Sequence, residues 1–189
     1  MADIILTLAQ IENLFQSVTM QMLGLPTTDI HGNPINQDKV RIAWPATGAP
    51  AWKITDDIIF IRVTPNNDPI IQQRDIVYTQ YDTNNSNRTA SYARNHTIQW
   101  TCYGPNSFDN ADKIRNGIFL ITYKEIFDTN NLSLIPIVSA PIRAPELFNG
   151  QWWDRSDIQA SFNEAVTRTG TVPYIQEVIV GTEVQLKKG

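Results

Sequence analysis

Apolar residues repeat at spacings of three and four near the start of the chain, which is typical of an amphipathic helix. The repeat covers residues 8–22. Thr7 followed three residues later by Gln10 forms a capping-box pattern at its start, and Gly24 and Pro26 are stop signals at its end. We therefore predict a helix at about residues 7 to 23, with one apolar face that packs on a partner surface.

A second apolar stripe with helical spacing follows Gly104-Pro105, with Asn106 or Ser107 as its cap. The stripe predicts a helix from about residue 107 to 121, which continues less regularly to Phe127. Its apolar members are Phe108, Ala111, Ile114, Ile118 and Ile121. Asp109 in the first turn suits the helix dipole.

Alternation of apolar and polar residues predicts strands in most of the remaining chain. The clearest case is residues 92–103, where the side chains from His96 to Cys102 fall on one face at every second position and polar side chains fall on the other. Further strands are expected at residues 40–44, 57–64, 70–79, 132–142, 150–166 and 171–185. Residues 82–91 have no apolar side chain larger than alanine, and we expect a solvent-projecting loop or hairpin tip there.

The predicted order is a helix, several strands, a second helix and several more strands. It indicates an α+β fold, with a largely antiparallel (mixed) sheet and two main helices packed on one of its faces. No internal repeat is visible, and we expect residues 1–189 to form a single domain from which the 82–91 loop projects. The composition agrees, because isoleucine (24) far outnumbers leucine (10) and β-branched residues favour strands.

Composition excludes several classes of protein. Only 18% of residues are charged and the net charge is −4, which argues against a sequence-reading nucleic-acid binder. A single cysteine, Cys102, cannot form an internal disulfide, and with two histidines it makes a structural zinc site a poor hypothesis. No apolar run is long enough to span a membrane and no signal-peptide pattern opens the chain, so we expect a soluble protein without a membrane partner.

The sequence contains no recognisable catalytic set. Glycine-rich phosphate loops and the common hydrolase, metalloprotease and CxxC motifs are absent. We expect His96 to be a hydrogen-bonded core histidine and Cys102 a small buried hydrophobe. Local carboxylate pairs, such as Asp56 with Asp57 and Asp154 with Asp157, are more simply turn or strand-end residues than an acid–base pair. We therefore expect no enzyme activity and no cofactor or metal.

The tryptophans are better candidates for function. Trp152 and Trp153 are adjacent, so on a strand one points to the core and the other outward. With Arg155 beside it, the outward ring suits a protein interface. The alternatives are a sugar-stacking platform, with Trp44 or Trp52, or a ring covered by its own chain.

Four stretches, taken in order, resemble the neck or tail terminator proteins of tailed bacteriophages, especially contractile-tailed ones. The resemblance covers roughly residues 50 to 180. Its stretches are Ala51-Trp52 with DIIF and TPNNDP (57–60 and 64–69), WTCYGPN (100–106) with Ala111 and Ile114-Arg115, APEL (144–147), and GQWWDR (150–155) through Phe162-Asn163.

The resemblance implies a structural virion protein that is assembled in the host cytoplasm. Terminators form a ring, expected here to be a hexamer, that caps the tail tube and joins it to the head-side connector. They also contact the sheath in contractile tails. DNA passes through the ring without specific binding, and a mildly acidic subunit suits that passage because it does not attract phosphates.

The family has no catalytic residues to transfer, so interface roles rest on physical reasoning alone. We expect the interfaces to include Trp152, Trp153 and Arg155, together with the polar loop residues Asn84, Asn85, Asn87 and Arg88. A head-completion (stopper) protein or a tail-tube subunit is the nearest alternative. A carbohydrate-binding β module is a more distant one.

Overall fold

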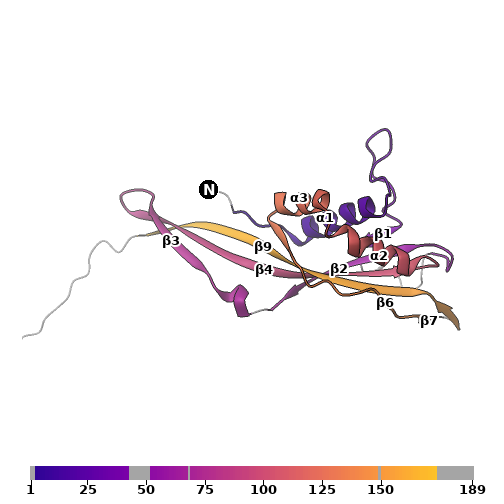
Figure 1. Cartoon of the computed structure of the whole chain (residues 1–189). Coiled ribbons are helices and arrows are strands. Elements are labelled where there is room, and N and C mark those ends of the chain that lie inside the picture. The colour runs from indigo at the N-terminus through magenta and orange to yellow at the C-terminus, as the bar shows by residue number, and fades with distance from the viewer. Residues whose placement is uncertain (1–2, 43–51, 68, 149, 174–189) are drawn as a thin grey trace, which may run out of the picture.

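The computed structural model describes residues 3–42, 52–67, 69–148 and 150–173. Its helices are α1 (Leu8–Met22), α2 (Ser107–Gly117) and α3 (Ile121–Thr129), with a short 3-10 helix η1 (Pro69–Gln72). Its strands are β1 (Val40–Ile42), β2 (Ile58–Asn66), β3 (Asp75–Gln80), β4 (Asn85–Tyr103), β5 (Leu132–Ile135), β6 (Ile142–Arg143), β7 (Glu146–Phe148), β8 (Gln151–Trp153) and β9 (Arg155–Pro173). The three α-helices lie on one side of a long sheet (Figure 1). The predicted α+β class is confirmed.

The sheet is built around the pairing of β4 with β9. These two strands are antiparallel and in register along their whole 19-residue length, from Asn85 opposite Pro173 to Tyr103 opposite Arg155. The main sheet has the order β1-β2-β4-β9-β5, and β3 and β6 pair with β4 and β9. Among the described strands, only β1 and β2 pair in parallel. The sheet is therefore mixed but mostly antiparallel.

Helix α1 forms as its sequence predicts. The Thr7 side chain accepts a hydrogen bond from the Gln10 amide, and the Gln10 side chain accepts one from the Thr7 amide, which completes the capping box. Gly24, just past the helix end, has φ +71°, a conformation that glycine adopts without strain.

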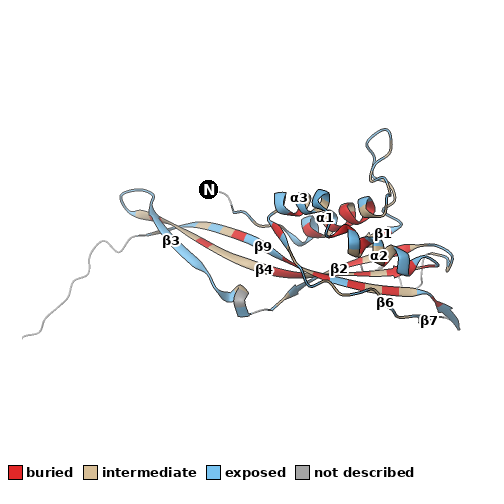
Figure 2. Ribbon diagram, viewed as in Figure 1, coloured by how far each residue is buried: buried red, intermediate tan, exposed pale blue. Residues whose placement is uncertain are grey.

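The core lies between the helices and the central part of β2, β4 and β9 (Figure 2). Phe15 of α1 is at its centre, with ring centroids 4.8 Å from Phe162, 5.3 Å from Phe127 and 6.1 Å from Trp100. The Trp100 indole N–H donates to the Thr19 hydroxyl at 2.9 Å, so the one polar atom of this buried ring is satisfied. One cluster thus joins α1, α3 and both long strands.

The predicted second helix is two helices in the structure. Helix α2 ends at Gly117, where a Cβ atom would lie 2.7 Å from the Met22 side chain of α1. Glycine permits this close approach of the two helices but is a weak helix former. The chain turns through residues 118–120, and α3 begins at Ile121. Periodicity alone did not reveal the break because the apolar stripe continues across it.

Other boundaries also differ from the predicted ones. Residues 70–79 split into η1 and β3, and residues 132–142 split into β5 and β6. Strand β4 begins seven residues before the predicted start at Tyr92, so most of the polar 82–91 segment is strand, and the hairpin turn occupies residues 81–84. The predicted strand at 150–166 is divided at Asp154 into β8 and β9, and β9 continues to Pro173, so the predicted separation from a strand beginning at residue 171 is wrong. The rest of the predicted 171–185 strand lies outside the described residues. Trp44 lies outside the described residues.

The position of Phe15 leads to a stability prediction. Phe15→Ala should lower the free energy of unfolding by about 3–5 kcal/mol, because it leaves a cavity between four elements. Leu8→Ala is the matched control on the same helix, since Leu8 is 53% exposed, and should change it by no more than about 0.5 kcal/mol. Urea unfolding measures both variants, and equal losses would contradict the assignment of the core.

Candidate interface surfaces

The β7–β8 hairpin presents an exposed apolar pair at one end of the sheet. Leu147 and Trp152 lie directly opposite each other across the two strands, and they are 55% and 66% exposed. Cross-strand neighbours on one face are close enough to form a single apolar surface. Of the adjacent tryptophans, Trp152 is therefore the outward one.

The other face of this hairpin packs against its own chain. Trp153 is 9% exposed, and its ring lies 6.0 Å from Trp52 and 6.4 Å from Phe148, measured between centroids. Trp52 also packs on Phe60 and Tyr103, at 5.1 and 5.7 Å. These rings fix the hairpin to the sheet, and they leave Trp152 as the one exposed tryptophan in the described part of the chain.

Arg155 supports the hairpin through a charged network at the start of β9. Its guanidinium donates twice to Asp157, at 2.8 and 2.9 Å, and once to Glu146 of β7 at 3.1 Å. The Tyr103 hydroxyl donates to the same Glu146 oxygen at 2.6 Å. Arg155 is thus engaged within its own chain and orients the hairpin that carries Trp152.

The network changes the acidity of its members. Burial, followed by the hydrogen bond to Glu146, raises the pKa of Tyr103 to about 12. The hydrogen bond from Tyr103, followed by the hydrogen bond and the positive charge of Arg155, lowers the pKa of Glu146 below its ordinary value. At neutral pH, Tyr103 is therefore protonated and Glu146 is ionised, which is the arrangement that the hydrogen bond between them requires.

The opposite end of the sheet is a narrow arm made of β3 and the distal parts of β4 and β9 (Figure 1). All six residues of β3 are exposed (Figure 2), among them Ile76, Val77 and Tyr78 at 43%, 56% and 60%. The arm is the part of the sheet that is least covered by the described chain.

The four polar residues predicted in this region all lie at or next to the arm tip. The Asp82 carboxylate accepts from the Asn85 side chain and from the backbone amides of Asn84 and Asn85, the latter two at 2.7 Å. The side-chain hydrogen bond from Asn85, followed by the backbone bonds, lowers the pKa of Asp82. Asn85 opens β4, whereas Asn87 and Arg88 point to opposite faces of that strand. The structure places Asn84, Asn85, Asn87 and Arg88 far along the sheet from Trp152, so the predicted residues form two separate surfaces (Figure 1).

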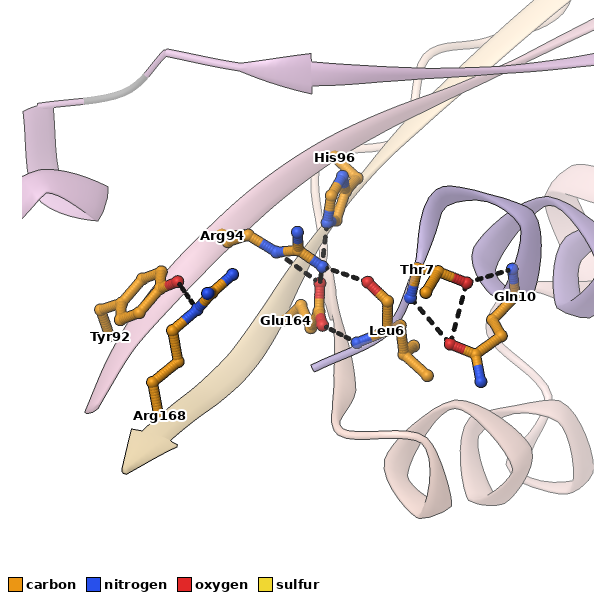
Figure 3. Close-up of polar contacts among 8 residues, drawn as sticks. All are labelled: Leu6, Thr7, Gln10, Tyr92, Arg94, His96, Glu164 and Arg168. Atoms are coloured by element: carbon orange, nitrogen blue, oxygen red, sulfur yellow. Dashed lines mark hydrogen bonds and ion pairs between the residues drawn. The ribbon is translucent and has the colours of Figure 1, made fainter. Parts of the chain in front are cut away.

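A buried carboxylate that sequence reasoning missed holds the N-terminal segment to the sheet (Figure 3). Glu164 of β9 is 1% exposed and accepts from the Leu6 amide (2.8 Å), the Arg94 guanidinium (2.6 and 2.9 Å) and His96 Nε2 (2.9 Å). Arg94 also donates to the Leu6 carbonyl at 2.7 Å, and Ile4 exchanges two backbone bonds with Thr167. The only sequence signal was a charged residue at an inward position of an alternating strand.

The remaining chemical candidates are structural. His96 is buried and bonded to Glu164, as predicted for a core histidine. Cys102 is buried, and burial followed by the charges of Asp157 and Asp57 raises the pKa of its thiol far above the range of a reactive cysteine. In the described ranges, no group of three or more His, Cys, Asp or Glu side chains is placed to hold a metal ion. No helix there is long and apolar enough to cross a membrane.

The Glu164 cluster gives the second prediction. Glu164→Gln should lower the free energy of unfolding by about 2–3 kcal/mol, less than for a fully buried pair because the Arg94 side chain is 31% exposed. Hydrogen exchange at the Leu6 amide should accelerate, because the amide loses a charged acceptor. Glu125→Gln on the exposed side of α3 is the control. Unchanged protection of Leu6 would show that Glu164 does not hold the segment.

A comparison with known families found one match across nearly the whole chain. The family model described as a phage neck terminator protein matches residues 9–188, which include every element of the structure apart from the first residue of α1. No curated protein matches the chain.

Proposed function

The chain belongs to the phage neck terminator protein family, and on that premise we propose that it forms a ring, of six subunits, that caps the tail tube and joins it to the head-side connector. The family is one of structural virion proteins of the tail and neck. The proposed partners are further copies of the chain, the tail-tube protein, the head-side connector and, in a contractile tail, the sheath. The ring leaves a channel through which DNA passes, and assembly takes place in the host cytoplasm.

The observation that carries the proposal is the exposed Leu147–Trp152 pair. Large aromatic side chains that are held rigidly and left exposed are typical anchors of protein interfaces. Trp152 projects from a hairpin that is fixed underneath by the Trp153 aromatic cluster and the Arg155 network. Little conformational freedom of this hairpin would be lost on binding, which favours association.

Two distinct exposed surfaces suit a ring. A subunit in a closed ring contacts its neighbours through two different surfaces, unlike a twofold dimer. The Trp152 hairpin and the arm lie at opposite ends of the β4–β9 pair, so the two surfaces do not overlap (Figure 1). We assign Trp152 and the arm-tip residues Asn84, Asn85, Asn87 and Arg88 to interfaces, with Trp153 and Arg155 as supporting residues, and we treat residues 1–189 as one functional domain.

A stopper protein and a tail-tube subunit are alternatives within the virion. Native mass spectrometry of the chain, alone and mixed with tail-tube protein, distinguishes them. We expect a closed ring near six subunits, or a ring that appears only with tubes. Growth into long tubes would favour a tube subunit. A monomer that does not bind the tail-tube protein would contradict the proposal.

The third prediction concerns Trp152. Trp152→Ala should weaken the ring by about 2 kcal/mol or more per interface, because it removes a central aromatic anchor. Ile30→Ala is the control, since Ile30 is 95% exposed and lies outside both surfaces. The populations of ring and free subunit in native mass spectra at several concentrations measure the effect. If the variant ring is as stable as the unmodified ring, the assignment of Trp152 to the interface is contradicted.

The fourth prediction concerns the arm tip. Replacing both Asn87 and Arg88 by alanine should reduce joining of tails to heads about tenfold, the loss expected from roughly 1.4 kcal/mol of contact energy. The matched control replaces Asn116 and Lys113 on α2, one amide and one cation that are both exposed. Counts of joined and unjoined particles by electron microscopy measure the effect. Equal joining by both double variants would contradict a role for the arm tip.

A further inference from the structure

The β4–β9 pair carries a continuous uncharged surface on the side facing away from the helices. Six consecutive cross-strand pairs on that face match in size and chemistry: Thr89–Thr169, Ser91–Thr167, Ala93–Ala165, Asn95–Asn163, Thr97–Ser161 and Gln99–Gln159. None of the twelve side chains is charged or larger than glutamine. At about 3.4 Å per residue, the surface is roughly 34 Å long.

The position of this uncharged face follows from strand alternation. Ile98, Trp100, Ile158 and Phe162 point into the core beneath the helices, so their neighbours in the two strands point to the opposite side. Of the twelve side chains only Asn95 is buried, while Gln159, Asn163 and Ala165 are exposed.

Side-chain hydrogen bonds order the middle of the face. The Asn66 amide of β2 donates to Asn95 at 2.6 Å, and the Asn95 amide donates to Asn163 at 3.0 Å. The hydroxyls of Thr97 and Ser161 lie 3.2 Å apart. These hydrogen bonds pair some of the polar groups of the face within the sheet. Fewer donors and acceptors are therefore left to bind another molecule.

The face lacks the kinds of side chain that most protein-binding and nucleic-acid-binding surfaces contain. It has no large apolar or aromatic side chain to anchor a protein interface. It has no lysine or arginine to bind phosphates and no carboxylate to repel them. By contrast, α1, α2 and α3 together carry eight charged residues. On the same side of the sheet, charged residues lie beside this pair of strands or beyond its uncharged stretch. Arg62 of β2 is opposite Gln99, Asp75 of β3 is opposite Ser91, and Asp157 and Arg155 lie past Gln159.

We propose that this uncharged face lines the channel of the ring and is the surface along which duplex DNA moves. The inference rests on the proposed function, which supplies the ring and the channel. A wall of hydroxyl and amide groups exchanges weak hydrogen bonds with the hydrated duplex and forms no ion pairs with it, so no position along the wall retains the DNA. The chain's net negative charge is carried elsewhere on the subunit.

The test places positive charge on the face. Gln159 and Ala165 are both exposed, and the double variant Gln159→Lys/Ala165→Lys adds two cations to each subunit. In phage carrying this variant, triggered DNA release should slow by about tenfold or more in 50 mM salt and recover towards the unmodified rate at 200 mM, because phosphate contacts weaken steeply with salt.

Two matched variants distinguish an effect of the added positive charge from an effect of the altered side chains on the structure of the face. Gln159→Glu/Ala165→Glu perturbs the same positions but adds no cation, and should release DNA at the unmodified rate. Gln21→Lys/Thr122→Lys adds two lysines to exposed positions on α1 and α3 and should also leave release unchanged. Equal rates for the two face variants, or equal slowing by both lysine variants, overturn the assignment of the face.

A crosslinking measurement covers the case in which the lysine variant fails to assemble. A photoreactive benzoylphenylalanine at Gln159 should crosslink to DNA in particles stalled during release, whereas the same group at Thr122 should not. Crosslinks from position 159 to protein alone overturn the assignment while leaving the ring intact. Absence of the unmodified chain from the neck of assembled particles instead overturns the proposed function, and the channel with it.

Discussion

The antiparallel pairing of β4 with β9 is the constraint on which the rest of the structure depends. Because the two 19-residue strands stay in register from end to end, each sends alternate side chains to the same two faces over their whole length. One face collects Ile98, Trp100 and Phe162 and forms the core with the helices. A slip of one residue would exchange the two faces and expose that core. The strand pairing therefore determines the core, the uncharged face and the separation of the two candidate interfaces.

The strands extend further than the core that stabilises them. Apolar burial is concentrated beneath the helices, and beyond that region the arm depends mostly on ladder hydrogen bonds and small polar pairs. Glu164 lies near this transition and ties the N-terminal segment to both long strands. A buried carboxylate needs several donors to offset its desolvation, and here Arg94, His96 and the Leu6 amide provide them. At the other end, the Arg155 network and the aromatic cluster fix the hairpin that carries Trp152.

The candidate functional sites of this chain are exposed surfaces, which is consistent with a family of structural virion proteins. His96 and Cys102 are both buried and serve packing and hydrogen bonding. The candidate surfaces described above are an apolar hairpin pair, a polar arm tip and an uncharged sheet face. In the proposed function and the further inference, the first two surfaces bind neighbouring proteins and the third lets a polyanion pass.

Local patterns were enough to predict the α+β class, helix α1 with its Thr7–Gln10 cap, the buried face of β4 and the outward position of one adjacent tryptophan, since each depends on the periodicity of neighbouring residues. The family resemblance likewise rested on short stretches in order. The other features of the structure depend on contacts between residues that are distant in the sequence. The break after Gly117 depends on Met22 of another helix, and the choice of Trp152 over Trp153 depends on Trp52, about 100 residues away. The Glu164 cluster and the matched pairs of the uncharged face depend on the β4–β9 register, which brings together residues up to 88 positions apart. A single strand shows which residues share a face, but only the tertiary structure shows what lies beside them.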